Sequence, residues 1–323
     1  MAASRNSLRS SLPARVAAFL ATRTTPDEKI CVGLSGGRDS VVLLHVLTVL
    51  GLRERLRAVH VHHGLSENAD RWADFCTDYC QGLGIDLRVE RVEVDRHSGL
   101  GLEAAAREAR YRAFSGSAGE LLLLGHHRGD QAETLLFNLL RGAGVAGAAG
   151  IPAERREHRL RILRPLLDVS RDEIEAYARD HRLDWVDDES NSDTGLSRNF
   201  LRHQVLTVLA ARFPAAEVNL AQAAGRFAEA DDLLGELALI DWRAAADGDA
   251  LKLAKLRELS LPRLKNLLRF RLRQLGWHAP AAARLEEFSR QLLTAGADRH
   301  PALDLAEGSI VAGCGALRWV ARG

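Results

Sequence analysis

The stretch LSGGRDS at residues 34–40 decides the fold. The apolar run KICVG at 29–33 is typical of a short buried strand, and VVLLHVLTVL at 41–50 is long and apolar enough for a helix. Two glycines and two serines therefore join the end of a strand to the start of a helix. Such a turn directs backbone N–H groups and the positive end of the helix dipole at one spot, where an anion such as phosphate is favoured.

The same alternation continues along the chain. Strand-like runs lie at 29–34, 57–63, 86–94, 121–125 and 159–166, separated by helix-like stretches at 40–50, 67–82, 102–116 and 130–141. Strands that alternate with helices predict an α/β fold, with a Rossmann-like parallel sheet covered by helices on both faces. Ligands of such sheets bind beyond the carboxyl ends of the strands, near the point where the strand order reverses.

Three polar motifs follow predicted strand ends, and we expect them to converge on one crevice. They are SGGRDS at 35–40, HVHHGLSENADRW at 60–72 and GHHRGDQAET at 125–134. Asp130 and Glu133 are three residues apart and so share a helix face, where with Asp39 they could hold a metal and a phosphate. The same two acids would also suit the positive end of a helix dipole without any functional role.

The helix-like stretch EAAAREARYRAF at 103–114 places Arg107, Arg110 and Tyr111 on one face. Two guanidinium groups near the crevice favour binding of a phosphate or a carboxylate. An ordinary surface ion-pair face is the alternative.

The pattern changes after Asp168. Ser170 and Glu173 form a capping box that predicts the start of an amphipathic helix, the polar stretch 187–199 predicts a loop, and a further helix ends at Pro214. We therefore place the domain boundary at 213/214. Residues 1–213 form the catalytic domain, and residues 214–323 form a linker helix and a smaller, mainly helical C-terminal domain.

Charge is distributed unevenly in this second part, although the 323-residue chain has a net charge of only +1. Residues 215–250 carry a net charge of −6, and residues 251–273 carry +7. The basic segment predicts a face that meets nucleic acid, with a solvated helix face as the alternative. The candidate binding residues are Lys252, Lys255, Arg263, Lys265 and Arg269.

Composition excludes several classes of protein. No apolar run reaches the roughly 18 residues of a membrane-spanning helix, so we expect no membrane partner. Four cysteines without a C-x-x-C pair give no zinc or iron–sulfur signature and favour reduced thiols of the cytoplasm. The Arg- and Ser-rich beginning hints at a transit peptide, but a first amphipathic helix of the domain is the preferred interpretation.

Taken together, these segments resemble one known family. SGGRDS matches the S-G-G-x-D-S signature of the PP-loop, or N-type ATP pyrophosphatase, superfamily. The motif order is similar to that of the tRNA(Ile)-lysidine synthetases, through HVHHGL, AREARY, GHHRGDQAET, LLRGAG, RPLL, DESNSD and RNFLR. The resemblance runs from about Lys29 to Arg202, and a looser match from Leu261 is similar to the first C-terminal domain of longer members.

The resemblance implies a ligase of the cytoplasm that uses ATP and Mg²⁺. Its members adenylate C2 of the wobble cytidine in an isoleucine tRNA with a CAU anticodon and release pyrophosphate. The ε-amino group of free L-lysine then expels AMP, and the resulting lysidine changes the codon read from AUG to AUA. The family also suggests a homodimer.

The resemblance assigns roles to residues of this chain. Ser35, Gly36, Gly37, Arg38, Asp39, Ser40 and His127 would bind ATP, with the pyrophosphate held by backbone N–H groups. Asp39 and Asp130 would bind Mg²⁺, and Glu133 would complete the metal or lysine-ammonium site. Arg110 and Arg202 would hold a phosphate or the lysine carboxylate. Asp130 is the candidate general base.

One position departs from the family pattern H-x-D-D-Q-x-E-T: Gly129 stands where the first Asp is usual. We still expect an active enzyme, because Mg²⁺ keeps several waters and needs few carboxylates. Two alternatives stay open. A tRNA 2-thiolation enzyme shares the PP-loop but uses paired cysteines or an iron–sulfur cluster, and a catalytically inactive tRNA-binding module rests on Gly129 alone. A small-molecule synthetase that makes GMP or NAD is disfavoured by the basic segment.

Overall fold

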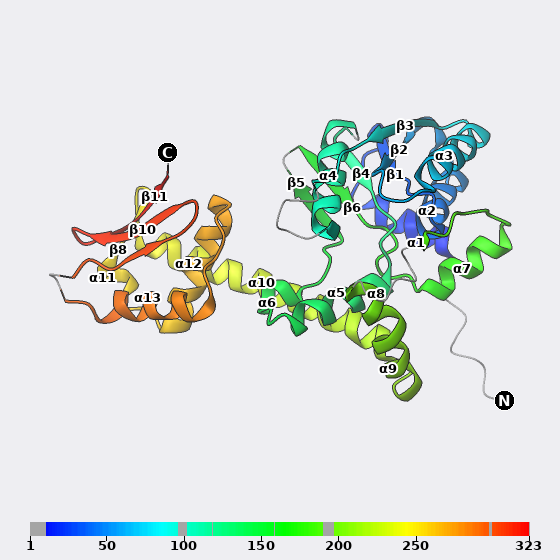
Figure 1. Ribbon diagram of the computed structural model, residues 1–323. Coiled ribbons are helices and arrows are strands. Elements are labelled where there is room, and N and C mark those ends of the chain that lie inside the picture. Colours follow the sequence, from blue (N-terminus) through cyan, green and yellow to red (C-terminus); the bar gives the residue numbers. More distant parts are fainter. Residues whose placement is uncertain are drawn as a thin grey trace. The chain divides into compact units, whose positions relative to one another are not determined.

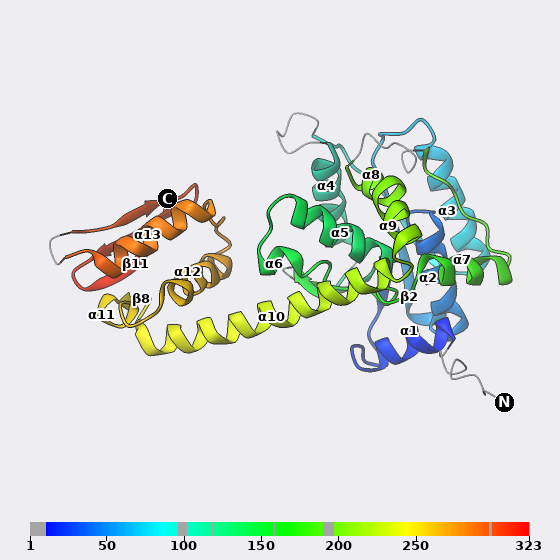
Figure 2. The ribbon, with the colours of Figure 1, turned by 90° about the horizontal axis from the view of Figure 1, so that it is seen from below.

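The computed structural model describes residues 11–95, 102–117, 119–157, 159–189, 197–296 and 299–322. It divides into two compact units, one up to Ala228 and one from Glu229 onward. This division falls inside the 30-residue helix α10 (Ala216–Ala245), which Figure 2 shows as uninterrupted. The boundary predicted at 213/214 stays a prediction.

The first unit is built on a six-stranded sheet with the order β3-β2-β1-β4-β6-β5 (Figure 1). All neighbouring strands are parallel except the β5–β6 pair, which is antiparallel. The strands are β1 (Ile30–Gly33), β2 (Leu56–His62), β3 (Asp86–Arg91), β4 (Leu121–Leu123), β5 (Glu154–Glu157) and β6 (Leu160–Leu163). The parallel sheet confirms the predicted fold class.

Helices cover both faces of this sheet, and side chains of β1 alternate between them. Ile30 and Val32 pack with residues of α1, α2, α3 and α7, whereas Cys31 packs with Tyr111 and Phe114 of α4. The helices before α10 are α1 (Leu12–Ala21), α2 (Arg38–Val49), α3 (Ala69–Leu83), α4 (Leu102–Ser117), α5 (Arg128–Leu140), α6 (Val145–Ala148), α7 (Arg171–Asp180), α8 (Ser197–Phe200) and α9 (Leu206–Arg212).

The strand order reverses between β1 and β4, since β2 and β3 lie on one side and β6 and β5 on the other. At this switch point the loop after β1 and the loop after β4 emerge side by side. Two of the three predicted motifs therefore meet at the position where α/β sheets bind ligands.

Two local predictions about this unit have clear outcomes. Ser170 Oγ accepts a hydrogen bond from Glu173 N, and Glu173 Oε2 accepts one from Ser170 N, so the capping box at the start of α7 is confirmed. Helix α1 begins at Leu12 and buries Val16 and Leu20. Residues 1–10 of the predicted first helix and residues 190–196 of the predicted loop lie outside the described residues.

The second unit combines helices with a small antiparallel sheet of order β7-β8-β11-β10-β9. Its helices are α11 (Leu253–Leu256), α12 (Leu261–Leu275) and α13 (Ala282–Thr294). Its strands are β7 (Ala246–Asp247), β8 (Ala250–Lys252), β9 (Ala302–Asp304), β10 (Gly308–Gly313) and β11 (Ala316–Ala321). The helices agree with the predicted character of this region, but the sheet was not anticipated.

A tight turn between β10 and β11 explains part of this sheet. Cys314 and Gly315 both have positive φ, at 48° and 74°, as the two central residues of a two-residue hairpin turn require. In the sequence, this hairpin is therefore indicated only by a single Cys-Gly pair between short runs of alternating apolar and polar residues.

Candidate active site

The PP-loop connects β1 to α2 and is held by its own two serines. Ser40 Oγ donates to Gly37 O at 2.8 Å, and Ser35 N and Gly37 N donate to Ser40 Oγ and Ser35 Oγ at 3.2 Å each. From the neighbouring strand, His60 Nδ1 donates to Leu34 O at 2.9 Å. These contacts fix the loop in front of the first turn of α2, and the start of a helix favours a bound anion.

Two glycines permit this arrangement because other segments approach them closely. Gly36 has a φ of +86°, and a Cβ there would lie 2.8 Å from Val186 Cγ2. A Cβ at Gly125, directly after β4, would lie 2.9 Å from Asp39 O. Gly125 was not among the predicted site residues, although a glycine at the end of the strand beside β1 was the available signal. It lets the β4 loop touch the start of α2.

His127 caps the N-terminus of α5 in an arrangement that depends on Gly129. Gly129 N donates to His127 Nδ1 at 3.0 Å, and His127 N donates to Asp130 Oδ2 at 2.8 Å. A Cβ at position 129 would lie 2.7 Å from His127 Cε1. The imidazole therefore fills the space that a side chain at 129 would need, so the unusual glycine has a structural explanation.

Asp39 and Asp130 each place a carboxylate oxygen near Nε2 of this imidazole. His127 Nε2 is 3.6 Å from Asp39 Oδ2 and 3.9 Å from Asp130 Oδ2. Since Nδ1 accepts a hydrogen bond, Nε2 carries the proton and faces both carboxylates. The sheet switch point thus brings together Asp39 and Asp130, the two predicted metal ligands, from segments 91 residues apart.

These two carboxylates fit a magnesium ion that is shared with phosphates. Asp39 Oδ1 is buried and makes no hydrogen bond within the described residues, with Arg38 Nε 3.5 Å away, so it is open to a cation. No group of three or more His, Cys, Asp or Glu side chains in the described ranges is placed to hold a metal. Mg²⁺ typically takes only one or two carboxylates and completes its shell with phosphates and water.

Glu133 faces Arg202 rather than open space. Arg202 Nε and one terminal nitrogen donate to Glu133 Oε1 and Oε2 at 2.6 and 3.0 Å, and the same terminal nitrogen is 3.4 Å from Asp130 Oδ1. Arg202 lies in a π-helical turn (Leu201–Val205) between α8 and α9. Three predicted site residues therefore form one network, and the guanidinium ties the turn to α5.

Burial and charge act differently on the two acids of α5. Burial opposes ionisation of Asp130, but His127, His126, the His127 N–H and Arg202 together hold its pKa below the usual range. Burial raises the pKa of Glu133, and the hydrogen bonds from Arg202 oppose that rise without cancelling it. Asp130 is therefore the carboxylate that stays ionised most readily.

Arg110 reaches the same edge of the sheet from α4, as predicted. Burial lowers the pKa of His63 to about 4, with Arg110 as the next cause. Burial likewise lowers the pKa of His126 to about 3, and Arg164, Arg110 and Arg107 add to this. The α4 side of the site is thus positively charged and the α5 side carries the acids.

Arg38, another predicted ATP-binding residue, begins α2 and points toward α7. One of its terminal nitrogens pairs with Glu175 Oε2 at 3.0 Å, and its Nε is 3.5 Å from Asp39 Oδ1. The side chain therefore links the start of α2 to α7 and stays beside Asp39.

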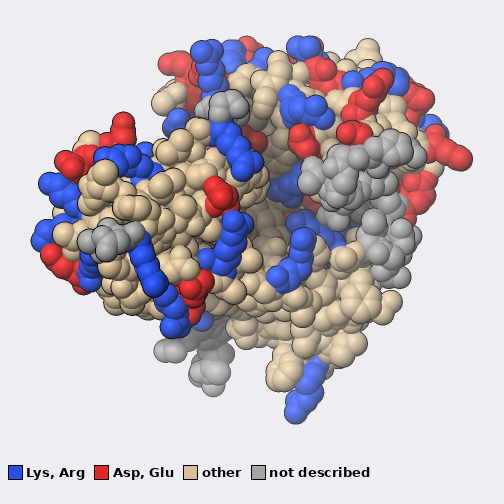
Figure 3. All heavy atoms as spheres, turned by 60° about the vertical axis from the view of Figure 1, so that its left-hand side comes forward, with Lys and Arg blue, Asp and Glu red and all other residues tan. Residues whose placement is uncertain are grey.

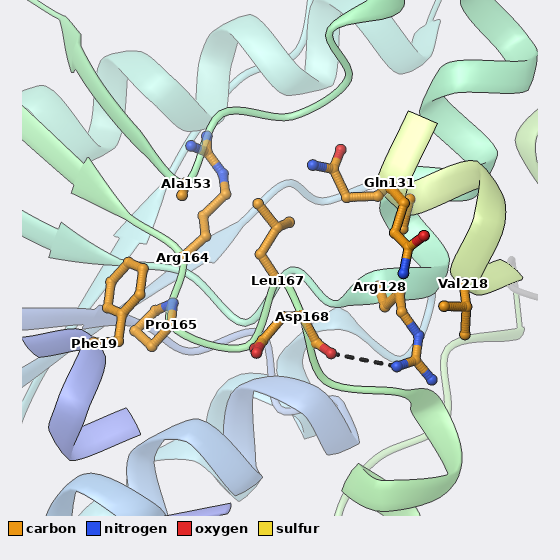
Figure 4. A pocket seen from close by; sticks show the side chains of 11 residues that line it. Phe19, Arg128, Gln131, Ala153, Arg164, Pro165, Leu167, Asp168 and Val218 are labelled. Carbon is orange, nitrogen blue, oxygen red and sulfur yellow. Dashed lines mark hydrogen bonds between the residues drawn. The ribbon is translucent and has the colours of Figure 1, made fainter. Parts of the chain in front are cut away.

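A hollow of about 370 Å³ lies on the other side of α5 (Figure 4). Polar side chains that line this hollow already make hydrogen bonds within the protein. Arg128 Nε donates to Glu217 Oε1 at 2.8 Å, and Gln131 exchanges hydrogen bonds of 2.8 and 2.6 Å with the backbone of Ile151. Arg164, which is only 1% exposed, donates to Pro152 O. This hollow contains none of the predicted site residues.

The predicted nucleic-acid residues of the second unit mostly have acidic partners. Arg263 pairs with Asp241, Lys265 Nζ lies 2.9 Å from Glu286, Lys255 Nζ lies 2.9 Å from Glu258, and Lys252 Nζ lies 4.0 Å from Asp247. Arg273 also pairs with Asp231 of α10. The acidic and basic segments thus partly neutralise each other. On the face shown in Figure 3, basic and acidic side chains are interspersed. Arg269 is exposed. The role predicted for these five residues stays a prediction.

Comparison with known proteins shows which family this chain is similar to. The PP-loop domain family matches residues 8–209, and the TilS substrate binding domain family matches residues 251–318. A tRNA(Ile)-lysidine synthase of Aromatoleum aromaticum is 49% identical over 85% of this chain and 65% of its own length. One of Pseudomonas aeruginosa is 46% identical over 90% of this chain and 68% of its own length.

The chain belongs to the tRNA(Ile)-lysidine synthase family. The predicted resemblance is therefore confirmed, and the chain spans about 65% of the length of the first of these relatives. Among solved structures, a U34-tRNA thiolase of Methanococcus maripaludis with a [4Fe-4S] cluster has a TM-score of 0.54 at 18% identity, over 68% of this chain and 78% of its own. At that identity the similarity to this chain shows a shared fold and nothing further. No helix among the described residues is long and apolar enough to cross a membrane.

Proposed function

We propose that this protein ligates lysine to C2 of the wobble cytidine of an isoleucine tRNA with a CAU anticodon, at the expense of ATP. One observation carries the proposal. The switch point of the sheet places the PP-loop and Asp39 against Asp130, in a chain of the lysidine synthase family. An adenylating enzyme must hold the phosphates of ATP and a charge-neutralising ion in one place. A phosphate-binding loop beside two carboxylates can do both.

In the first step, the cytidine C2 oxygen attacks the α-phosphate of ATP and pyrophosphate leaves. Backbone N–H groups of the PP-loop other than those of Ser35, Gly37 and Ser40, which already donate within the loop, would hold the departing pyrophosphate at the start of α2. Asp39 and Asp130 would hold Mg²⁺, which when bound neutralises charge on the phosphates. His127, with its Nε2–H between the two carboxylates, would keep both oriented.

In the second step, the lysine ε-amine attacks C2 and AMP leaves. The amine must first lose a proton, and Asp130 is the candidate acceptor because its lowered pKa keeps it ionised at neutral pH. The same low pKa makes it a modest base that also suits holding the ammonium. Arg110, on the positively charged α4 side, would hold a phosphate or the lysine carboxylate. Glu133 would act mainly through Arg202, which it holds beside Asp130.

The two alternatives receive little support. Thiolation by paired cysteines needs reactive thiols, but Cys31, Cys76 and Cys80 are buried and their pKa values are raised by burial to about 11, 12 and 12. Cys314, the fourth, lies in the second unit. The inactive-module alternative rested on Gly129, whose missing side chain makes room for the His127 cap.

The test uses purified protein, ATP, labelled lysine and two transcripts. One transcript is the isoleucine tRNA with a CAU anticodon, and the other is an initiator methionine tRNA with the same anticodon. We expect lysine incorporation and pyrophosphate release with the first only. Pyrophosphate release without incorporation would assign a different nucleophile, and no reaction with either tRNA would contradict the proposal. A homodimer and a cytoplasmic location complete the proposal and are tested by sedimentation and by fractionation.

A further inference from the structure

Two segments of the first unit carry positive charge and no negative charge. Residues 134–153 and 197–216 together contain four arginines, at 141, 198, 202 and 212, and no Asp or Glu. In the structure these segments are neighbours, because α8 and the π-helical turn pack on α5.

Aromatic rings lie among these arginines. The Arg141 guanidinium carbon is 5.1 Å from the centroid of the Phe137 ring, and that of Arg198 is 5.9 Å from the same centroid. On α9, the Arg212 guanidinium carbon is 5.7 Å from the Phe213 centroid. Each pair combines a flat apolar face with a cation, the combination that proteins use to stack bases and hold their phosphates.

Much of this surface is exposed. Phe213 is 59% exposed, Val208 70% and Phe200 44%, and Leu140 at the end of α5 is 74% exposed. The lower right of Figure 3 is a broad area without acidic side chains and with a basic side chain at its lower end. Contiguous exposed apolar surface is characteristic of interaction sites. We call this surface the aromatic–basic face; it consists of Phe137, Arg141, Arg198, Phe200, Arg212 and Phe213.

The α5 part of the aromatic–basic face begins beside the candidate active site. Asp130, Glu133, Phe137 and Arg141 are spaced by three, four and four residues, and so form one stripe along α5. Arg202, in the turn between α8 and α9, pairs with Glu133 and lies 3.4 Å from Asp130. A strand of nucleic acid that leaves the catalytic acids along α5 therefore meets Phe137 one turn later.

We propose that the aromatic–basic face binds the single-stranded tRNA nucleotides that flank the base held in the active site. This inference rests on the proposed function and names the surface that it uses. Single-stranded loops are bound through unstacked bases on aromatic rings and guanidinium planes, with the backbone held by cations. The face supplies three cation–ring pairs, and charge complementarity with phosphate selects this partner.

A second copy of the chain fits the face less well. A two-fold interface brings the same patch of both subunits together, so the arginines of one copy would lie near those of the other. The two segments contain no acid of their own, although Arg202 pairs with Glu133 of α5. Dimerisation through this face is therefore an outcome of the test rather than the proposal.

The test compares two surface variants of the full chain. The first is Arg212→Ala/Phe213→Ala, on the aromatic–basic face. The matched control is Val49→Ala/Arg53→Ala, which removes an exposed valine and an exposed arginine near the opposite edge of the sheet. The dissociation constant of the CAU isoleucine transcript is measured against salt concentration, and sedimentation gives the oligomeric state. ATP binding checks that each variant is folded.

We expect the first variant to bind tRNA roughly 5- to 100-fold more weakly than wild type, the effect of losing one base stack. The slope of log K against log salt should fall in magnitude by about 0.7 for one lost phosphate contact. The control should match wild type, and Phe213→Trp should retain affinity. Equal tRNA binding by both variants would overturn the proposal, as would a loss of dimer with unchanged tRNA affinity.

A second measurement uses the unmodified chain and so does not depend on a variant folding. A transcript with 4-thiouridine in the anticodon loop is irradiated in complex with the protein, and the cross-linked peptides are identified. Cross-links to residues 137–141 or 198–213 are expected, whereas cross-links confined to the second unit would overturn the proposal. Failure of wild type to bind the transcript at all would instead contradict the proposed function.

Discussion

The carboxylate of Glu133 and the guanidinium of Arg202 form a two-point contact, with Nε–Oε1 and terminal N–Oε2 distances of 2.6 and 3.0 Å. Glu133 is 3% exposed, so its charge depends on this partner. Because Arg202 also approaches Asp130, the pair helps to position this candidate catalytic residue and ties the turn that carries Arg202 to α5.

Breaking this pair should cost stability and activity together. Glu133→Gln leaves Arg202 with one neutral acceptor, and loss of one partner of a buried pair typically costs about 3–5 kcal/mol. Because Arg202 is partly exposed, we expect a loss of stability at the lower end of this range. Urea unfolding measures the change in the free energy of unfolding. Arg202→Lys keeps the charge but not the two-point geometry, and should show an intermediate loss. Wild-type stability in Glu133→Gln would contradict the pairing.

Gly125→Ala should damage ATP binding while the chain stays folded. The added methyl would lie 2.9 Å from Asp39 O and 3.1 Å from Ser40 N, so the β4 loop and the start of α2 must separate. A displacement of about 1 Å at a reacting centre can cost roughly 100-fold in activity. ATP titration by calorimetry measures the effect. Gly116→Ala in α4, whose added methyl meets nothing within 4 Å, is the control and should bind ATP normally.

Asp39→Asn should shift the magnesium requirement. The amide retains the shape of the side chain but loses the negative charge of the carboxylate. Loss of a residue that supports a metal ligand typically lowers metal affinity roughly 10- to 100-fold. Asp39 is itself a proposed ligand, so we expect pyrophosphate release by Asp39→Asn to need at least that much more Mg²⁺. A magnesium titration of pyrophosphate release, with ATP saturating, is the measurement. An unchanged titration curve would remove Asp39 from the metal site.

Gly129→Asp, which restores the usual family residue, should destabilise this protein rather than improve it. The new Cβ would lie 2.7 Å from His127 Cε1, and its carboxylate would approach Glu217. Loss of the His127 cap costs about 1 kcal/mol. Thermal unfolding with lysine incorporation measures both effects. Gly129→Ala separates the steric contribution from the charge, and a gain of activity in Gly129→Asp would show that the His127 cap is dispensable.

Acid should weaken the fold partly through His63. Its folded-state pKa is about 4, against an ordinary value of 6.5, so the unfolded chain binds more protons between these values. The free energy of unfolding therefore rises with pH across this window. The contribution of His63 to it is lost as the pH falls from about 6.5 toward 4. His63→Gln should show a flatter pH dependence in urea unfolding at pH 7.5 and 5. Parallel losses in the two proteins would exclude this histidine as a contributor.

Local signals in the sequence predicted much of the first unit. The apolar runs located all five parallel strands, and the Ser170–Glu173 capping box located the start of α7. The β5 strand, ERRE, was missed because its four residues are charged and carry no apolar alternation. The strands of the second unit were not predicted either. The two longest, GSIVAG and ALRWVA, contain several Gly and Ala residues, which have little preference for strands.

The candidate site was predicted in outline but not in its pairings. Parallel strands bring motifs to one edge, so Asp39, Asp130 and Arg110 could be grouped from sequence alone. The partner of Glu133 could not, because Arg202 lies 69 residues further along the chain and reaches α5 only through tertiary packing. The pairing of the acidic segment with the basic one, as in Asp231 with Arg273, has the same origin.

The π-helical turn at Leu201–Val205 has a consequence for how the chain tolerates change in length. Such a turn holds one residue more than α-helical winding would, and each residue rotates the rest of the helix by about 100°. Deleting a single residue here would restore regular winding. It would then turn either Arg202 away from Glu133 or the exposed side of α9 away from α5. The extra residue therefore sets the rotation of α9 relative to the Arg202–Glu133 pair, so insertions and deletions should be far more harmful at this turn than substitutions.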